Sequence, residues 1–216
     1  MKIQVLISKG SWANIYVNDF KKILSNYSHK ITFLNDHRKL RKNFDVNIIF
    51  SYFNLINKKY LNRSKYNIVP HESDLPKGRG MSPITWQLLK NKNIIIFSLI
   101  EASEKLDAGD VYYKKKISFK RDLLFHEIKK IQFEENLKLI KKFLLILKKK
   151  KFAPKAKPQK GTKTFFKLRT KKNSKINIHK SLKSQFNLIR LSDFENYPAF
   201  FNIYKKKYLI QLIKEK

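Results

Sequence analysis

His71 is the histidine of this chain whose neighbours suit acid–base chemistry. It opens a stretch rich in carboxylate, hydroxyl, glycine and proline residues at positions 71–80, and a second turn at positions 106–110 carries the carboxylate of Asp107. A carboxylate beside an imidazole holds the ring in one tautomer, and such pairs commonly transfer protons in enzymes. The alternatives are a structural histidine and an aspartate that caps a turn. We expect the two residues to meet in one active site.

The segments that must position these residues have the pattern of an α/β protein. Short, β-rich apolar runs alternate with helical spacing, which predicts a mostly parallel sheet with crossover helices. One run leads directly into His71, and ligands of open α/β sheets bind at the carboxyl ends of the strands. The predicted strands are residues 3–7, 30–34, 45–52, 67–70, 94–100 and 111–117, and the predicted helices are residues 16–26, 83–90 and 121–147.

The chain divides into three expected parts. Residues 1–150 form the predicted catalytic domain, and residues 151–161 form a lysine- and proline-rich linker with almost no large apolar residue. Residues 162–216 form a small α+β unit. Its predicted elements are strands at 163–168, 199–204 and 208–213 and a helix at 181–191.

The charge balance is strongly basic, with 49 Lys and Arg against 16 Asp and Glu and a net charge of +33. This balance suits a nucleic acid, an anionic membrane or a phosphorylated substrate. The alternative is a genome bias toward A/T-rich codons, because lysines are spread over nearly every segment. Cysteine is absent, which excludes disulfides, thiolate metal sites and a cysteine nucleophile, and we expect no metal site. The apolar runs are too short for a signal peptide or a membrane span, so we expect a cytoplasmic protein without membrane contact.

The two turns also carry a family resemblance. A His-x-Ser-x-Leu-Pro turn, a Gly, a Pro that opens a helix and a Leu-Asp-x-Gly-Asp turn follow in order, and together they resemble the folate-dependent formyltransferase family. The matching positions are His71, Ser73, Leu75, Pro76, Gly80, Pro83, Leu106, Asp107, Gly109 and Asp110. Residues 51–56 resemble the loop that lines the folate pocket in that family, and residues 166–177, 185–190 and 197–201 resemble its later segments.

The resemblance implies a Rossmann-like domain that uses 10-formyltetrahydrofolate as a co-substrate and transfers its formyl group to an amine. The catalytic residues implied or proposed on this basis are His71, Asp107 and Asn67. The expected contacts to the folate are Ser73, Asp74, Leu75, Pro76, Tyr52, Leu55, Glu101, Ala102 and Asp110.

One position departs from the family. Its members carry an Asn two positions before the histidine, where this chain has Val69. Asn67 shares a strand face with Val69, but a regular strand places it roughly 13 Å from His71 along the chain, at about 3.3 Å per residue. Asn67 can therefore replace the missing amide only if the backbone is irregular. Ser73 or a backbone N–H is the alternative donor.

The identity of the amine is open. The first hypothesis is a nucleotide-linked amino sugar, because the small C-terminal unit offers Tyr197, Phe200 and Phe201 as aromatic surface. The alternative is initiator methionyl-tRNA, which the positive charge favours, although the unit is short for the β-barrel of the tRNA enzymes. A third hypothesis is a catalytically inactive basic binding protein, supported by Val69. A homodimer is left open.

Overall fold

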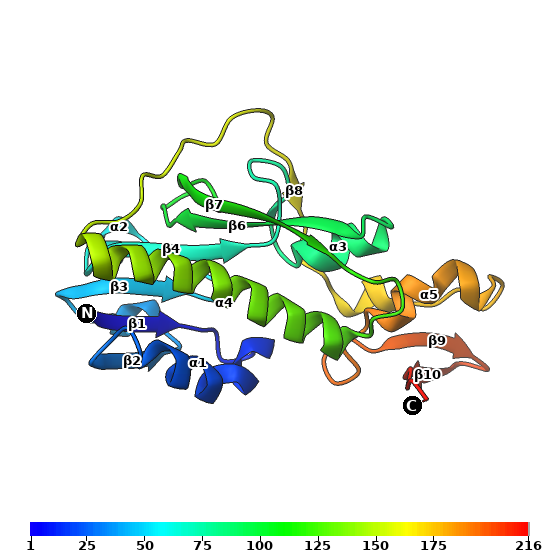
Figure 1. The fold of residues 1–216 in the computed structure, drawn as a ribbon. Coiled ribbons are helices and arrows are strands. Elements are labelled where there is room, and N and C mark those ends of the chain that lie inside the picture. Colours follow the sequence, from blue (N-terminus) through cyan, green and yellow to red (C-terminus); the bar gives the residue numbers. More distant parts are fainter. Residues whose placement is uncertain (216) are drawn as a thin grey trace.

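The computed structural model describes residues 1–215, and a six-stranded sheet lies at its centre (Figure 1). The strand order is β2-β1-β3-β4-β6-β7. The first four strands are parallel, whereas β6 is antiparallel to β4 and β7 is antiparallel to β6. The strands are β1 (Lys2–Leu6), β2 (Lys30–Leu34), β3 (Phe44–Ile49), β4 (Ser64–His71), β6 (Ile94–Glu101) and β7 (Val111–Ser118). The predicted α/β fold with a mostly parallel sheet is confirmed.

A long helix, α4 (Phe125–Lys150), lies across one face of this sheet (Figure 1). Its apolar residues recur every three or four positions, and Ile140, Phe143 and Leu144 are fully buried. Burying each such side chain stabilises the fold by about 1.5–3 kcal/mol. The remaining helical elements of the sheet domain are η1 (Trp12–Tyr16), α1 (Val17–Leu24), η2 (His37–Lys39), α2 (Lys58–Leu61) and α3 (Pro83–Leu89).

Helix α4 begins at Phe125, four residues later than the sequence pattern suggests. The Leu124 backbone N–H donates to the Glu127 carboxylate at 2.7 Å, which satisfies one of the free donors at the start of the helix. The first residues of the predicted helix therefore remain in the preceding turn.

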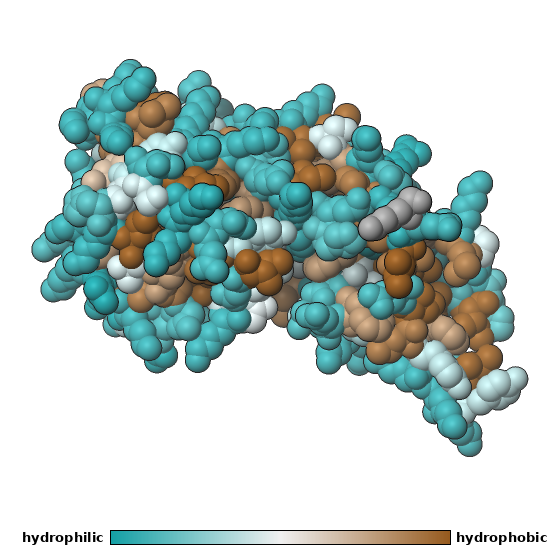
Figure 2. Space-filling model, turned by 60° about the horizontal axis from the view of Figure 1, so that its bottom comes forward, coloured by the Kyte–Doolittle hydropathy of each residue, from teal (hydrophilic) through white to brown (hydrophobic). Residues whose placement is uncertain are grey.

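The C-terminal unit lies at one end of the molecule (Figure 1). A small cluster of Ile176, Ile189 and Ala199 forms its core. Several large apolar side chains of the unit are exposed, and Figure 2 shows apolar surface gathered over this end. The elements of the unit are η3 (Lys171–Ser174), α5 (Leu182–Arg190), β9 (Ala199–Ile203) and β10 (Lys206–Ile210). The last residue of the predicted unit lies outside the described residues, and the three-part division stays a prediction.

The chain between α4 and this unit runs back over β7 and β6 (Figure 1). We call residues 151–161 the strap. It leads into β8 (Phe165–Phe166), a two-residue strand that pairs in parallel with β5 (Arg79–Gly80). The sequence predicts a longer strand here and does not predict β5. The pairing ties the turn after His71 to the start of the C-terminal unit.

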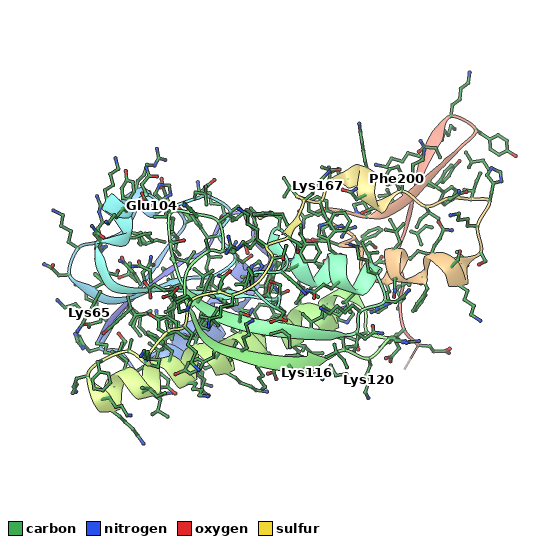
Figure 3. All side chains as sticks on the ribbon, turned by 90° about the horizontal axis from the view of Figure 1, so that it is seen from above. Lys65, Glu104, Lys116, Lys120, Lys167 and Phe200 are labelled. Carbon is green, nitrogen blue, oxygen red and sulfur yellow. The ribbon has the colours of Figure 1, made fainter. Side chains whose placement is uncertain are left out.

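The positive charge is distributed over the surface. The lysines labelled in Figure 3 come from β4 (Lys65), β7 (Lys116), the loop that follows it (Lys120) and the segment after β8 (Lys167). Lys116 and Lys120 lie near each other, whereas Lys65 and Lys167 lie at two other places on the molecule. Among residues 1–215, no helix combines the length and the apolar character that a membrane crossing requires.

Candidate functional site

His71 is the last residue of β4 and is 6% exposed. Its ring lies between two acceptors, with Nε2 2.8 Å from the Gly78 carbonyl oxygen and Nδ1 3.6 Å from Oδ2 of Asp107. Because a carbonyl can only accept, the Nε2 atom must carry the hydrogen of the shorter contact. In the neutral ring, Nδ1 is then left with a lone pair beside a carboxylate. This arrangement lets Nδ1 take up a proton and lets the carboxylate stabilise the resulting imidazolium.

Asp107 reaches His71 through a loop that folds back over the sheet. Because β6 is antiparallel to β4, Glu101 at its end lies opposite Ile68 rather than beside His71. The loop after β6 therefore returns toward the end of β4, where Oδ2 of Asp107 accepts a hydrogen bond of 2.8 Å from the Gly80 N–H. The return is tight, since a Cβ on Gly109 would lie 1.7 Å from the Glu101 carbonyl oxygen.

The Asp107 backbone is in the left-handed region, with φ of +47°. Few residues other than glycine adopt this conformation, and it persists only where the surrounding contacts impose it. The Gly80 hydrogen bond is one of these contacts. The carboxylate is therefore held by the loop and by the turn after His71 together.

A half-open cavity lies beside Asp107, between the loop after β3, the end of β4 and the loop after β6, with about 450 Å³ of empty space that includes open solvent. Four of the residues predicted for the site line it: Tyr52, Leu55, Ala102 and Asp107. Val69 lines it as well, at the position where the resembling family carries Asn. The lining also includes Asn54 and Ile56 from residues 51–56, the segment expected at the folate pocket, and Ile100, Ser103 and Lys105 from the end of β6 and the loop after it. The sequence did not single out Ile49 or Leu61 as lining residues.

Other predicted folate contacts do not line this cavity. Ser73 and Leu75 are buried in the turn after His71, and the Asp74 carboxylate instead accepts a hydrogen bond of 2.6 Å from Lys114 Nζ. Pro76, Glu101 and Asp110 also lie outside the lining. Their predicted contacts to the folate stay predictions. The hydroxyl of Ser73 is buried without a hydrogen-bond partner among the described residues.

Asn67 lies deeper in β4, and its strand is regular. Its side chain accepts from Asn47 Nδ2 at 3.2 Å and donates to the Leu61 carbonyl at 3.1 Å. The backbone irregularity that would bring this amide close to His71 does not occur, because Asn67 and Ile68 pair in register with β3. The structure does not bring Asn67 together with the His71–Asp107 pair, and its catalytic role stays a prediction.

The Glu101 side chain supports the strand edge near this loop. Its carboxylate accepts from the Asn67 backbone N–H at 2.8 Å and from the Tyr112 hydroxyl at 2.6 Å. Burial raises the pKa of Glu101 above its usual range, and the two hydrogen bonds oppose part of that effect. Both carboxylate oxygens therefore have partners within the protein.

A buried polar network lies on the α4 side of His71, and no local sequence pattern predicts it. The Glu72 carboxylate, 6% exposed, accepts from Gln132 at 2.8 Å and from Asn136 at 2.6 Å. Lys129 donates to Gln132 at 2.9 Å and lies over the Trp12 ring. Burial lowers the pKa of Lys129 to about 8, although the charge of Glu72 acts in the opposite direction. The network fixes the residue that follows the candidate histidine.

The segment that leads into the C-terminal unit also contacts the turn after His71. The Thr164 hydroxyl accepts from the Gly78 N–H at 2.8 Å, and the Thr164 carbonyl accepts from the Arg79 N–H at 2.9 Å. A Cβ on Gly80 would lie 2.3 Å from the Phe166 carbonyl oxygen. These contacts span more than eighty residues of sequence, so no local pattern signals them. Within residues 1–215, no three His, Asp or Glu side chains gather as a metal site.

Residues 2–142 match a protein-family model that is described as formyl transferase. A curated relative, a methionyl-tRNA formyltransferase from Sulfurihydrogenibium sp., is 30% identical over 148 residues, which cover 68% of this chain and 47% of that protein. The chain thus spans about half the length of the curated relatives it matches.

Solved structures show the same fold. A methionyl-tRNA formyltransferase from Clostridium thermocellum superposes with a TM-score of 0.78 at 24% identity, covering 100% of this chain and 94% of that one. A sugar N-formyltransferase from Shewanella sp. superposes with a TM-score of 0.70 at 16% identity, covering 100% of this chain and 99% of that one. At these identities the likeness concerns the fold alone.

Proposed function

Because the chain belongs to the formyl transferase family, we propose that it transfers a formyl group from 10-formyltetrahydrofolate to a primary amine. The observation that carries this proposal is the His71–Asp107 pair, with 3.6 Å between Nδ1 and Oδ2, beside the cavity that Asp107 helps to line. Asp107 lines the cavity and His71, which does not, contacts Asp107 from behind it. Acid–base groups beside a cavity are what transfer between two bound substrates requires.

We propose that the cavity receives the folate. Its lining combines apolar side chains, such as Leu55 and Val69, with the hydroxyl-bearing Tyr52 and Ser103. A flat ring system with polar edges suits such a surface, because the apolar side chains contact its faces while hydrogen-bonding groups orient it. When bound there, 10-formyltetrahydrofolate supplies the formyl group attached to its N10 atom.

The proposed steps follow from the two ring nitrogens of His71. Nε2–H is held by the Gly78 carbonyl, so Nδ1 is the atom that accepts the proton of the attacking amine. The Asp107 carboxylate then stabilises the imidazolium. As the bond between the formyl carbon and N10 breaks, His71 returns its proton to that nitrogen, which leaves as a neutral amine. A new N–C bond has formed, and the enzyme has recovered its starting state.

At the position of Val69, the family carries an Asn whose amide donates a hydrogen bond to the formyl oxygen. Its side chain lines the cavity and cannot donate a hydrogen bond. Loss of one oxyanion donor typically reduces kcat by about 10²- to 10³-fold. We therefore expect a slow enzyme unless a backbone N–H or bound water supplies the missing hydrogen bond.

For the acceptor, the comparisons support initiator methionyl-tRNA, the alternative hypothesis from the sequence, better than the nucleotide-linked amino sugar. The curated relatives near 30% identity are named methionyl-tRNA formyltransferases. A net charge of +33 also suits a polyanionic substrate. We propose initiator methionyl-tRNA as the acceptor and treat a nucleotide-linked amino sugar as the competing outcome of the test.

The test presents purified protein with 10-formyltetrahydrofolate and, separately, with charged initiator tRNA or a panel of dTDP- and UDP-linked amino sugars. Release of tetrahydrofolate and the mass of the formylated product are measured. We expect turnover with the tRNA and a loss of at least 100-fold in His71→Asn. Turnover with amino sugars alone would overturn the acceptor but retain the transfer. Absence of folate binding in calorimetry would overturn the proposed function as a whole.

A further inference from the structure

The strap is fixed to the edge of the sheet next to the candidate site. Lys157 and Val111 exchange two backbone hydrogen bonds of 2.8 and 2.9 Å, which form an antiparallel bridge at the start of β7. Figure 1 shows the strap running from the end of α4 across the molecule toward β8, and Figure 3 shows it running toward Lys167. The bridge places Gln159, two residues further along, beside the loop that carries Asp107.

The Gln159 side chain uses its donors and its acceptor to join two segments. Nε2 donates to the backbone carbonyls of Asp107 and Gly109, both at 2.8 Å. Oε1 accepts from the Arg79 guanidinium, at 2.7 Å from Nη2 and 3.3 Å from Nε. A single amide thus connects the loop after β6 with the turn after His71. Of the twenty side chains, only an amide offers two N–H donors and a carbonyl acceptor in this geometry.

Both segments need such a contact. Asp107 has a φ of +47°, a conformation that persists only when the surroundings impose it. Its carbonyl is held by Gln159, and its carboxylate is held by the N–H of Gly80, the residue that follows Arg79. The backbone carbonyl and the carboxylate of Asp107 are therefore each held by a hydrogen bond, in the residue that lies 3.6 Å from His71.

We infer that Gln159 is a positioning residue of the formyl-transfer site, which acts by holding Asp107 against His71. This inference rests on the proposed function. It assigns a role in the reaction to the strap, a segment whose composition is that of a solvated linker.

The first experiment measures kcat and KM in Gln159→Ala and Gln159→Glu. Glutamate retains the contact to Arg79 but presents a carboxylate to two carbonyl oxygens. Both variants therefore lose the hydrogen bonds to the carbonyls of Asp107 and Gly109. We expect kcat to fall about 10- to 100-fold, because small displacements of catalytic groups have effects of this order. The KM for folate should stay within about twofold of the natural value.

Gln185→Ala is the matched control. Gln185 is half-buried like Gln159, and its amide accepts from the Asn177 N–H and donates to the carbonyls of Asn177 and Lys180 within the C-terminal unit. We expect it to lower the melting temperature about as much as Gln159→Ala while leaving kcat unchanged. If the two variants affect kcat alike, Gln159 has no special role and the inference is wrong.

A double-mutant cycle tests whether Gln159 acts through Asp107. In an Asp107→Asn background, Gln159→Ala should lower kcat by less than about threefold, because residues that act as a unit are not additive. Equal losses in both backgrounds would overturn the inference.

Hydrogen exchange separates this inference from the proposed function. In Gln159→Ala, amides in residues 79–80 and 107–110 should exchange faster than in the natural chain, whether or not the protein transfers formyl groups. Unchanged exchange in these segments would show that Gln159 does not hold the loop, whereas a natural chain without transferase activity would refute the proposed function instead.

Discussion

The sharpest test of the candidate site is Asp107→Asn. Asparagine is nearly isosteric with aspartate, and its carbonyl oxygen can still accept the hydrogen bond that Gly80 donates at 2.8 Å. The substitution therefore removes a charge and keeps the contact that anchors the loop. Asp107→Leu is the companion variant, since it removes both.

The expected effect follows from the geometry of the pair. The side chains of His71 and Asp107 are 7% and 12% exposed and their closest charged atoms are 3.6 Å apart, so solvent screens them little. At an effective dielectric constant of about 20, a carboxylate and an imidazolium at this distance attract by about 4–5 kcal/mol. This attraction exists only while the histidine carries the proton. Its loss should reduce kcat by about 10³-fold, at roughly 1.4 kcal/mol for each factor of ten.

Single-turnover release of tetrahydrofolate, measured with saturating amine and folate, isolates the chemical step. We expect Asp107→Asn to lose about 10³-fold in rate and to retain its melting temperature within a few degrees, whereas Asp107→Leu should lose both. If Asp107→Asn keeps more than about a third of the natural rate while Asp107→Leu unfolds at lower temperature, the carboxylate is a structural anchor and the proposed proton transfer is wrong.

Three further predictions concern other parts of the molecule. Gly80→Ala should lower the melting temperature more than Gly161→Ala. Both glycines have φ near +103°, but only a Cβ on Gly80 meets the neighbouring strand, at 2.3 Å. Equal decreases in melting temperature would mean that backbone conformation alone is responsible. Lys129 has its pKa lowered to about 8, so the stability of the natural chain should rise as the pH increases from about 8 to 10.5. Lys129→Met should lose this rise and the exposed-site control Lys130→Met should keep it, and a rise retained in Lys129→Met would contradict the assignment. Val69→Asn should raise kcat at least tenfold if the donor is missing, and an unchanged rate would show that another group already faces the formyl oxygen.

Parts of the fold could be predicted because their signals are local. Strand β2 (Lys30–Leu34) coincides with its predicted range, and β1 and β6 end within a residue of theirs. Apolar runs that a sheet buries on both faces carry this information in a few consecutive residues. The direction of β6 carries no such signal, since an antiparallel strand buried in the same sheet has the same composition.

The candidate site was predictable to a similar degree. His71 was expected at the end of its strand and lies there, and Asp107 lies beside it. Asp107 was expected on the loop after the strand at 94–100, and that loop returns toward His71 because β6 is antiparallel to β4, a direction that the apolar pattern does not signal. The catalytic roles of both residues stay predictions. Gln159 could not be found from sequence, because a glutamine in a stretch of lysines and prolines has the composition of a solvated segment.

The contacts around the β5–β8 pairing join the turn after His71 to residues that are added much later during synthesis. Gly78 donates to a hydroxyl 86 residues later in the chain, and the region that matches the family model ends at residue 142, before that hydroxyl has been added. On the ribosome, the residues of the sheet emerge first and can begin to pack while the turn after His71 still lacks its partners. A chain that ends before Thr164 would therefore lack the hydrogen bonds that hold the turn after His71, whatever part of its sheet has packed by then.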